Sequence, residues 1–341
     1  MRKYSVGIVG ATGAVGLEML RTLEERRFPV RELRLYASDR SRGKSLLFGG
    51  RPIPIESLSS GTWKHIDFAL FSAGAAVSRE FAPRFSENGT FVIDNSSAWR
   101  MDPDVPLLVP EVNPQTLQSD SRIIANPNCS TIQMVVALKP LHDAAGLKRV
   151  IVATYQAASG AGGLAIEDLQ AQLRAWASNQ PIPQSKKLPA QIAFNVIPQI
   201  DVFTENSYTK EEMKMLNETR KIMGIPDLAV SATCVRVPVF RGHSEAVWAE
   251  FNRPMSGKTA QDILSTAHGV KLIDGTTGSA SYPMPFHSEG KYDVFVGRVR
   301  DDISMNNSIA MWIVSDNLLK GAASNAVQIA EIIHERGFVK A

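Results

Sequence analysis

The segment Val6-Gly7-Ile8-Val9-Gly10-Ala11-Thr12-Gly13-Ala14-Val15-Gly16 decides the fold of the first half of this chain. Its apolar start, Val6–Val9, predicts a short strand, and the spacing of apolar residues over Ala14–Arg26 predicts a helix directly after it. Glycines at such a junction allow a tight turn, and the helix N-terminus can then receive a pyrophosphate. The spacing is GxxGxxG rather than GxGxxG, but the physical requirement is the same. The segment therefore predicts a dinucleotide site, and the alternative is a glycine turn needed only for helix–sheet packing.

The elements that follow predict two different folds in the two halves of the chain. In the first half, strands at 33–37, 68–72, 91–94 and 122–125 alternate with helical patterns, which is typical of a doubly wound parallel sheet of Rossmann type. After Asn128, helices at 130–145, 164–177 and 209–223 precede or interrupt longer strands with alternating polar residues, at 148–156, 232–239, 244–252, 292–300 and 308–314. That alternation favours an α+β domain whose mostly antiparallel sheet is open on one face. We expect residues 1–127 to form the first domain, completed by a C-terminal helix over 317–341, and residues 128–316 to form the second.

Composition limits the class of protein. A length of 341 residues suggests about two domains, and 44% hydrophobic with 21% charged residues is typical of a globular protein. The net charge of +3 is small and the basic residues are scattered, so nucleic acid is not expected as a partner. No apolar run has the length of a membrane span and no secretory signal precedes the first strand, so we expect a cytoplasmic protein. Two distant cysteines without a CxxC favour neither a disulfide framework nor a zinc site, and no metal is expected.

A cysteine stands where a loop gives way to a helix, in Asn126-Pro127-Asn128-Cys129-Ser130-Thr131. In the first turn of a helix, the positive end of the dipole favours thiolate over thiol. Because the thiolate is the nucleophilic form, Cys129 is a candidate for covalent catalysis. The alternative is a small buried apolar cysteine.

Such a nucleophile needs a nearby acid or base, and His243 is the candidate among the six histidines. It lies in the turn Arg241-Gly242-His243-Ser244-Glu245 between two β-like segments. Arg236, on the preceding segment, suits a carboxylate because its guanidinium can bind one bidentately. A turn histidine and a strand-face arginine are the alternatives.

Three more places offer polar groups. The glycine-rich loop after Gln156, with Ser159 and Gly160, can approach a nicotinamide closely or be a simple turn. Glu211 and Lys214 share a helix face and can bind the ends of a charged substrate or form a solvated ion pair. The second strand ends Ala37-Ser38-Asp39-Arg40-Ser41-Arg42, and its basic and hydroxyl groups favour the 2′-phosphate of NADP, whereas Asp39 argues for NAD.

These segments together resemble aspartate-β-semialdehyde dehydrogenase, nearly end to end. The matching stretches are GIVGATGAVG, ASDRSRGK, VIDNSSAWRMDPDVPLLVPEVN, IIANPNCSTIQM, TYQAASGAGG, FNVIPQID, CVRVPVFRGHSE and DNLLKGAA. The resemblance implies reduction of L-aspartyl 4-phosphate by NADPH to L-aspartate 4-semialdehyde, with release of phosphate, in lysine, threonine and methionine biosynthesis. It also implies a homodimer.

The resemblance assigns roles residue by residue. Cys129 would form an acyl-thioester, His243 would act as acid and base on the oxygen and sulfur, and Gln156 would orient the substrate. The substrate-binding residues would be Arg236 for the α-carboxylate, Glu211 for the amino group, Arg100 and Lys214 for the phosphate, and Asn128. The cofactor positions would be Gly10, Ala11, Thr12, Gly13, Ser38, Arg40, Ser41, Ser159, Gly160 and Asn317.

Three other functions remain open from the sequence. An N-acetyl-γ-glutamyl-phosphate reductase would share the cofactor domain and the cysteine, but it needs no group such as Glu211 for a free amine. A non-catalytic NADP-binding paralogue would not need Cys129 and His243, and both are present. A cysteine hydrolase would have no use for the glycine loop.

Overall fold

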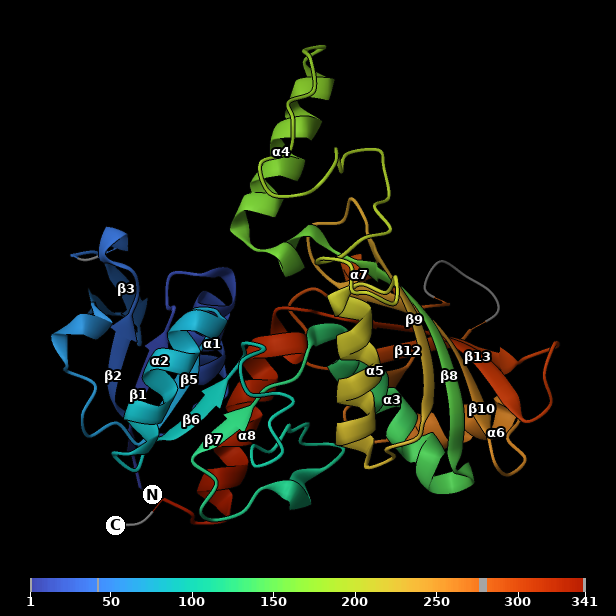
Figure 1. Cartoon of the computed structure of the whole chain (residues 1–341), viewed down its shortest axis with the longest axis horizontal. Coiled ribbons are helices and arrows are strands. Elements are labelled where there is room, and N and C mark those ends of the chain that lie inside the picture. The colour runs from blue at the N-terminus through green and yellow to red at the C-terminus, as the bar shows by residue number, and fades with distance from the viewer. Residues whose placement is uncertain (1, 42, 276–280, 340–341) are drawn as a thin grey trace. The chain divides into compact units, whose positions relative to one another are not determined.

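The first predicted strand, β1 (Tyr4–Val9), is central in a seven-stranded sheet of the computed structural model, which describes residues 2–41, 43–275 and 281–339 (Figure 1). The strand order is β3-β4-β2-β1-β5-β6-β7, and all pairs are parallel except β3 with β4. The other strands are β2 (Val30–Tyr36), β3 (Ser45–Phe48), β4 (Arg51–Glu56), β5 (Phe68–Phe71), β6 (Phe91–Asp94) and β7 (Ile123–Ala125). Without β3, this is the order of a doubly wound dinucleotide-binding sheet, so the predicted Rossmann-type fold is confirmed.

Helices bury both faces of this sheet, which explains why every residue of β1 is buried. Apolar residues of α1 (Ala14–Glu25) and α8 (Ser324–Glu335) join one core with Val6 and Ile8, and those of α2 (Ala75–Ser86) join another with Val9 and Phe71. Three short 3-10 turns, η1 (Asp39–Ser41), η2 (Leu58–Ser60) and η3 (Pro114–Thr116), complete this part of the chain.

A six-stranded mixed sheet organises the second half of the chain, in the order β11-β12-β13-β10-β8-β9. The pairs β8–β9 and β11–β12 are parallel, and the three central pairs are antiparallel. The strands are β8 (Leu147–Gln156), β9 (Ala229–Arg236), β10 (His243–Phe251), β11 (Val270–Leu272), β12 (Val294–Asp301) and β13 (Ser308–Ser315). The mostly antiparallel second sheet is therefore confirmed.

Helices α3 (Cys129–Ala145) and α5 (Lys210–Met223) pack on one face of this sheet, and α4 (Gly163–Ala177) projects away from it (Figure 1). Residues of β8 alternate between buried and exposed, as a sheet with one open face requires. The remaining elements are η4 (Ala158–Ala161), α6 (Gly257–Ser265), α7 (Pro285–Ser288) and the π-helical turn η5 (Leu319–Ala323). None of the described helices is both long and apolar enough to cross a membrane.

Contacts divide the chain into two units, Met1–Asn128 with Ala322–Ala341, and Cys129–Gly321. The sequence placed these divisions after residues 127 and 316. The C-terminal segment differs from the prediction. The sequence predicts a continuous helix from residue 317, whereas α8 begins at Ser324. Asp316 Oδ1 accepts the backbone N–H groups of Leu318 at 3.0 Å and Leu319 at 3.3 Å, and the π-helical turn follows before the regular helix starts.

Five further helices and strands were not predicted from the sequence: β3, β4, α6, β11 and α7. The pair β3–β4 is a hairpin closed by Gly49-Gly50, and its second strand carries Pro52 and Pro54. Proline inside an apolar run argues against a strand, because it cannot donate to the hydrogen-bond ladder. Here β4 pairs with β2 only through Leu35–Ile55 and Tyr36–Glu56, so the prolines are tolerated.

The glycine junction after β1 gives a test of the first unit. Gly10 has φ +89°, and a Cβ on it would lie 2.5 Å from the Ser72 carbonyl oxygen. We expect Gly10→Ala to lower the free energy of unfolding in urea by clearly more than Gly50→Ala. Gly50 also has a positive φ, +74°, but its Cβ would meet nothing within 4 Å. The control should cost about 1–2 kcal/mol for the left-handed backbone alone. Equal losses of unfolding free energy in the two variants would show that the close approach of residue 10 to Ser72 does not affect stability.

Candidate active site

Three polar side chains predicted from the sequence meet at one edge of the second sheet. Gln156 and Arg236 are the last residues of the parallel strands β8 and β9 and are direct register partners, and His243 begins the antiparallel strand β10. Because β10 runs against β8, with Ser244 opposite Tyr155, its first residue lies at the same edge. All three side chains are at least 96% buried. The sheet therefore presents an amide, a guanidinium and an imidazole together, away from bulk water.

His243 is fully buried, and its Nδ1 accepts a hydrogen bond of 3.0 Å from the backbone N–H of Ala157. Burial lowers the pKa of His243 to about 3, and the positive charge of Arg236 acts in the same direction. Glu211 and the Gly242 carbonyl favour the charged ring, but their effect is smaller. The imidazole is therefore uncharged near neutral pH.

Ala157 also holds Arg236. The Nη1 of Arg236 donates a 2.6 Å hydrogen bond to the backbone carbonyl of Ala157. Burial lowers the pKa of this guanidinium, and the negative charge of Glu211 is the largest effect that opposes this change. Gly160 lies against both side chains: a Cβ there would be 2.9 Å from Arg236 Nη1 and 3.0 Å from His243 Nε2. Any larger residue at position 160 would enter this space.

Cys129 is the first residue of α3, as the sequence predicted, and it is partly exposed. The helix N-terminus favours its thiolate. Gly321 approaches it so closely that a Cβ at 321 would lie 2.7 Å from Cys129 Cβ and 3.7 Å from Asn317 Cβ. Asn317 in turn accepts the Gly242 N–H at 2.8 Å and donates to Ser159 Oγ at 3.0 Å. These contacts connect the cysteine, the histidine turn and the glycine-rich loop.

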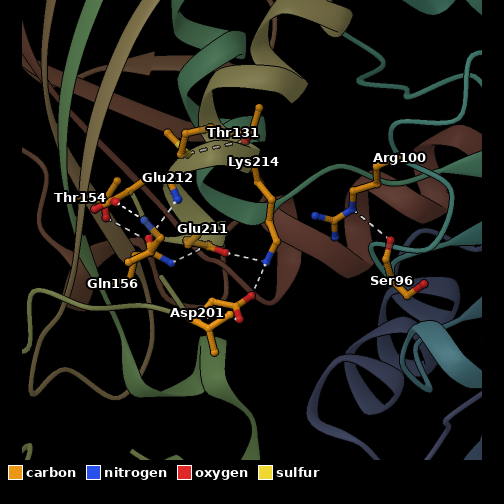
Figure 2. A network of polar contacts seen from close by, with 12 residues as sticks. Ser96, Arg100, Thr131, Thr154, Gln156, Asp201, Glu211, Glu212 and Lys214 are labelled. Atoms are coloured by element: carbon orange, nitrogen blue, oxygen red, sulfur yellow. Dashed lines mark hydrogen bonds and ion pairs between the residues drawn. The ribbon is translucent and has the colours of Figure 1, made fainter. Parts of the chain in front are cut away.

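A charged network stands beside Gln156 (Figure 2). Gln156 Nε2 donates to Glu211 Oε1 at 3.2 Å, and Lys214 Nζ bridges Glu211 Oε2 at 3.0 Å and Asp201 Oδ2 at 3.2 Å. Burial alone would lower the pKa of Lys214, but the two carboxylates outweigh it and raise that pKa above its usual value. A Thr209–Glu212 capping box fixes the start of α5 and hence the position of Glu211. Glu211 is buried and Lys214 is partly exposed, so the two form a partly buried ion pair rather than a fully solvated one.

The remaining predicted residues belong to the first unit. Gly10, Ala11, Thr12 and Gly13 form the junction between β1 and α1, and the N–H groups of Gly10 and Ala11 donate to the Tyr36 carbonyl. Among the residues that the structure describes, no side chain caps the N-terminus of α1. Ser38 and Arg40 are exposed directly after β2, with Ser41 partly buried. Asp39 forms no ion pair with any described residue; Arg42 lies outside them.

These features fit a dinucleotide phosphate, because the uncapped helix start offers backbone donors and Arg40 offers positive charge. Arg100 donates from Nε to Ser96 O at 3.0 Å and from Nη2 to Asn95 O at 2.9 Å. Asn128, the last residue of this unit, is 6% exposed.

Comparisons with known proteins show the family to which the chain belongs. Residues 5–120 match the NAD binding domain of the semialdehyde dehydrogenases, and residues 138–320 match their dimerisation domain. The aspartate-semialdehyde dehydrogenase of Aquifex aeolicus is 56% identical over 339 residues, covering 98% of this chain and 99% of that protein. The chain belongs to the aspartate-semialdehyde dehydrogenase family.

Two solved structures extend the comparison. Aspartate semialdehyde dehydrogenase II from Vibrio cholerae, complexed with ASA, has a TM-score of 0.95 and 48% identity, covering 98% of this chain and 99% of that one. The enzyme of Candida albicans with NADP has a TM-score of 0.77 and 26% identity, covering 99% and 100%. The family resemblance inferred from the sequence is therefore confirmed.

Several residues of this family member's site were not identified from the sequence. Asp201 ends the segment FNVIPQID and pairs with Lys214, and Ala157 acts through its backbone, which no side-chain pattern signals. Asp316 binds Arg241 at 2.7 Å and the Gly290 N–H at 2.8 Å, which fixes the turn before His243. Among the described residues, no group of three or more His, Cys, Asp or Glu is arranged to hold a metal ion.

Glu245 is a fully buried carboxyl two residues after His243 on β10. Burial raises its pKa well above the usual value, and the nearby Gln133 amide offsets this only in part. Gln133 Oε1 itself accepts a 2.7 Å hydrogen bond from Ser315 Oγ. Glu245 is thus an uncharged acid between the sheet and α3.

This carboxyl makes stability depend on pH. The native protein keeps the Glu245 proton at pH values where the unfolded chain has lost it, so the free energy of unfolding falls as pH rises above the unfolded pKa. The slope is at most about 1.4 kcal/mol per pH unit, until the native pKa is passed. We expect Glu245→Gln to gain stability relative to the wild type between about pH 5 and 7, in urea unfolding at several pH values. Glu167→Gln, at an exposed position on α4, is the control. If the free energy of unfolding of Glu245→Gln changed with pH in parallel with that of the wild type, the carboxyl of Glu245 would not be uncharged in the native protein.

Proposed function

We propose that this chain reduces L-aspartyl 4-phosphate with NADPH to L-aspartate 4-semialdehyde and releases phosphate, in the route to lysine, threonine and methionine. One observation carries the proposal: the Arg236 guanidinium is 96% buried, yet it forms no ion pair with any residue that the structure describes. A buried cation is costly unless an anion approaches it. A substrate carboxylate supplies that anion and can bind the guanidinium bidentately.

Cys129 provides the nucleophile in this proposal. Its thiolate attacks the acyl phosphate carbon, and phosphate leaves with the bridging oxygen to give an acyl-thioester. NADPH, when bound, supplies the hydride that reduces this carbon. The resulting thiohemiacetal on Cys129 collapses to the aldehyde and frees the thiolate. Covalent catalysis divides one difficult displacement into two easier steps, and His243 acts on the substrate oxygen as that oxygen gains negative charge.

The charged groups around Gln156 match the other ends of the substrate. Glu211 is proposed to bind the α-ammonium and Lys214 the phosphate, while Asp201 keeps Lys214 in place through the 3.2 Å contact. Gln156, fixed by Thr154 at 3.0 Å and by Glu211, orients the reacting carbonyl. Arg100 and Asn128 are proposed to complete the phosphate and substrate sites.

The cofactor site is proposed from the first unit. Gly10, Ala11, Thr12 and Gly13 would hold the pyrophosphate at the start of α1, and Ser38, Arg40 and Ser41 would hold the 2′-phosphate. Ser159, Gly160 and Asn317 are proposed to contact the nicotinamide end. The match to a dimerisation domain supports a homodimer, and a cytoplasmic location is proposed with it.

The alternative reductase makes a distinguishable prediction. An N-acetylated substrate has no ammonium group, so Glu211 would be an unneeded buried negative charge. The pairing of Glu211 with both Gln156 and Lys214 instead places it at the centre of the network. The family assignment agrees with the aspartyl substrate.

The direct test uses the absorbance of reduced nicotinamide. Purified protein is mixed with L-aspartate 4-semialdehyde, phosphate and NADP, and each substrate is omitted in turn. We expect growth of absorbance only when all three are present. No activity in this assay, with activity on N-acetyl-L-glutamate semialdehyde, would mean that the chemistry is as proposed but the substrate is different. Silence with both would contradict an acyl-phosphate reductase.

Replacement of the nucleophile is the first mutational prediction. A serine hydroxyl is far less acidic than a thiol, so Cys129→Ser should reduce turnover on the order of a thousandfold or more while NADP affinity changes little. Steady-state rates and fluorescence titration with NADP measure the two effects. Cys234→Ala is the matched control, because burial raises the pKa of that thiol well above its usual value. Retained turnover in Cys129→Ser would rule out the covalent route.

The second mutational prediction concerns the carboxylate anchor. Arg236→Lys keeps the charge but loses the planar fork, so we expect KM for the semialdehyde to rise roughly tenfold or more, from the loss of one charge-assisted hydrogen bond. Initial rates at varied semialdehyde give KM, and Arg84→Lys, at an exposed position on α2, provides the control. An unchanged KM would assign the carboxylate to another group.

A further inference from the structure

The first turn of α5 carries two neighbouring carboxylates that bind different partners (Figure 2). Glu211 contacts the site, where Gln156 Nε2 donates to its Oε1 at 3.2 Å. Glu212 instead accepts two backbone N–H groups: its Oε2 accepts that of Thr209 at 2.6 Å, and its Oε1 accepts that of Cys234 at 3.0 Å. Glu212 therefore joins the start of α5 to strand β9, and both of its oxygens take part.

Cys234 offers its N–H at the outer edge of the sheet. Strand β9 is the last strand of the sheet, and β8 pairs with it on one side only. Alternate residues of a strand direct their backbone N–H groups to the same side, so Cys234 and Arg236 both donate away from β8. The Arg236 N–H donates to the Ile197 carbonyl at 2.8 Å, and the Arg236 carbonyl accepts the Ile197 N–H at 2.9 Å. The end of β9 is thus held along its outer edge by Ile197 and by the Glu212 carboxylate.

This contact sets the spacing of the two groups proposed to bind the charges of an α-amino acid. Glu211 is next to Glu212 in the chain, and Arg236 follows Cys234 by two residues on the same buried face of β9. The hydrogen bond between Glu212 and Cys234 therefore fixes Glu211 relative to Arg236. The ammonium and the carboxylate of an α-amino acid are attached to one carbon, so a site that binds both needs its anion and its cation at a matching spacing. A misplacement of about 1 Å can reduce a rate on the order of a hundredfold.

The helix cap alone does not establish this spacing. Thr209 Oγ1 accepts the Glu212 N–H at 3.3 Å and completes the capping box, but both groups belong to the start of α5. The link to β9 is the second bond of the carboxylate. A carboxylate can accept at both positions, whereas a glutamine amide has one acceptor oxygen and an NH2 group that only donates. Glu212 is 8% exposed, so bulk water does not readily replace either bond.

We propose that Glu212 is a positioning residue that sets the spacing between Glu211 and Arg236 and thereby selects a substrate with an unmodified ammonium beside its α-carboxylate. This inference rests on the proposed function, in which Glu211 binds the ammonium and Arg236 binds the carboxylate. Glu212 acts through these two residues. It holds the helix that carries one of them against the strand that carries the other.

The test compares two aldehydes that differ by one amino group. Succinate semialdehyde has the carbon chain, the carboxylate and the aldehyde of L-aspartate 4-semialdehyde, but it has no ammonium. With phosphate and NADP held saturating, initial rates give kcat/KM for each aldehyde, and the ratio of the two values measures selection for the ammonium. If turnover of succinate semialdehyde is too slow to follow, its inhibition constant is compared with the KM of L-aspartate 4-semialdehyde instead.

We expect Glu212→Gln to lower this ratio roughly tenfold, the size expected when a hydrogen bond to a charged group is lost. A displaced Arg236 would affect both aldehydes and cancel in the ratio, whereas a displaced Glu211 affects only the aldehyde with an ammonium. Glu218→Gln makes the same change at a buried position later on α5 and should leave the ratio unchanged. Equal losses on the two aldehydes in Glu212→Gln, or a wild-type ratio near one, would overturn the inference.

Two further variants separate the contact with the strand from the helix cap and from folding. Thr209→Ala removes the hydroxyl of the capping box but keeps both bonds of the Glu212 carboxylate, so the ratio should stay near the wild-type value. A tenfold fall in Thr209→Ala would assign the spacing to the cap and overturn the inference. Glu212→Asp keeps the charge but is one methylene too short to hold both N–H groups, so its ratio should also fall. Circular dichroism reports which variants fold, and Glu212→Asp decides if Glu212→Gln does not.

A double variant shows whether Glu212 acts through the ammonium-binding group. With Glu211→Gln already in place, adding Glu212→Gln should lower the ratio no further, because the group that it positions is gone. Independent losses from the two changes would contradict the positioning role. Failure of the proposed function would appear differently, as a wild-type protein that does not turn over L-aspartate 4-semialdehyde in the complete assay.

Discussion

The backbone of Ala157 makes the interaction on which the rest of the site depends. Its N–H and its carbonyl hold His243 and Arg236, which come from two different strands, within one buried layer. Neither side chain has bulk water to solvate it, so the geometry of one peptide segment determines where the donor and the positive charge lie. A preorganised donor in a buried site stabilises developing negative charge more than the same group in water does. The strand ends bring the residues to one edge, and Ala157 sets their direction.

The same sheet face carries a second set of polar groups behind the site. These groups are Cys234 on β9, Thr154 on β8 and Glu245 on β10. Each lies two residues further from the edge of the sheet than the site residue of its own strand. Glu212 accepts the Cys234 N–H at 3.0 Å, and Gln133 on α3 lies beside Glu245. A purely apolar layer there would be easier to bury. The buried polar layer instead ties α3, which begins at Cys129, and α5, which carries Glu211, to the strands that end in the site.

The sequence predicted the two folds because strand and helix periods are local properties. It also identified the family, through motifs such as NPNCST and RGHSE. It could not predict the hairpin β3–β4, whose Pro52 and Pro54 argue against a strand, or the π-helical turn before α8, which depends on Asp316 and the close approach of Gly321 to Cys129. The partial burial of the Glu211–Lys214 pair also required the fold, since Asp201, which contacts Lys214, lies outside α5 in the loop before it. The role of Ala157 could not be predicted from the sequence, because its hydrogen bonds are made by backbone atoms, which every residue type has.

The central claim is that chemistry occurs on Cys129 at the edge of this sheet. Mass spectrometry of protein mixed briefly with L-aspartyl 4-phosphate, without cofactor, and quenched in acid tests it most directly. The account predicts the added mass of one aspartyl group on the peptide that contains Cys129, and none on the peptide that contains Cys234. The adduct should disappear when NADPH is added before quenching. An adduct at another residue, or no adduct from protein that turns over in the complete assay, would contradict the account.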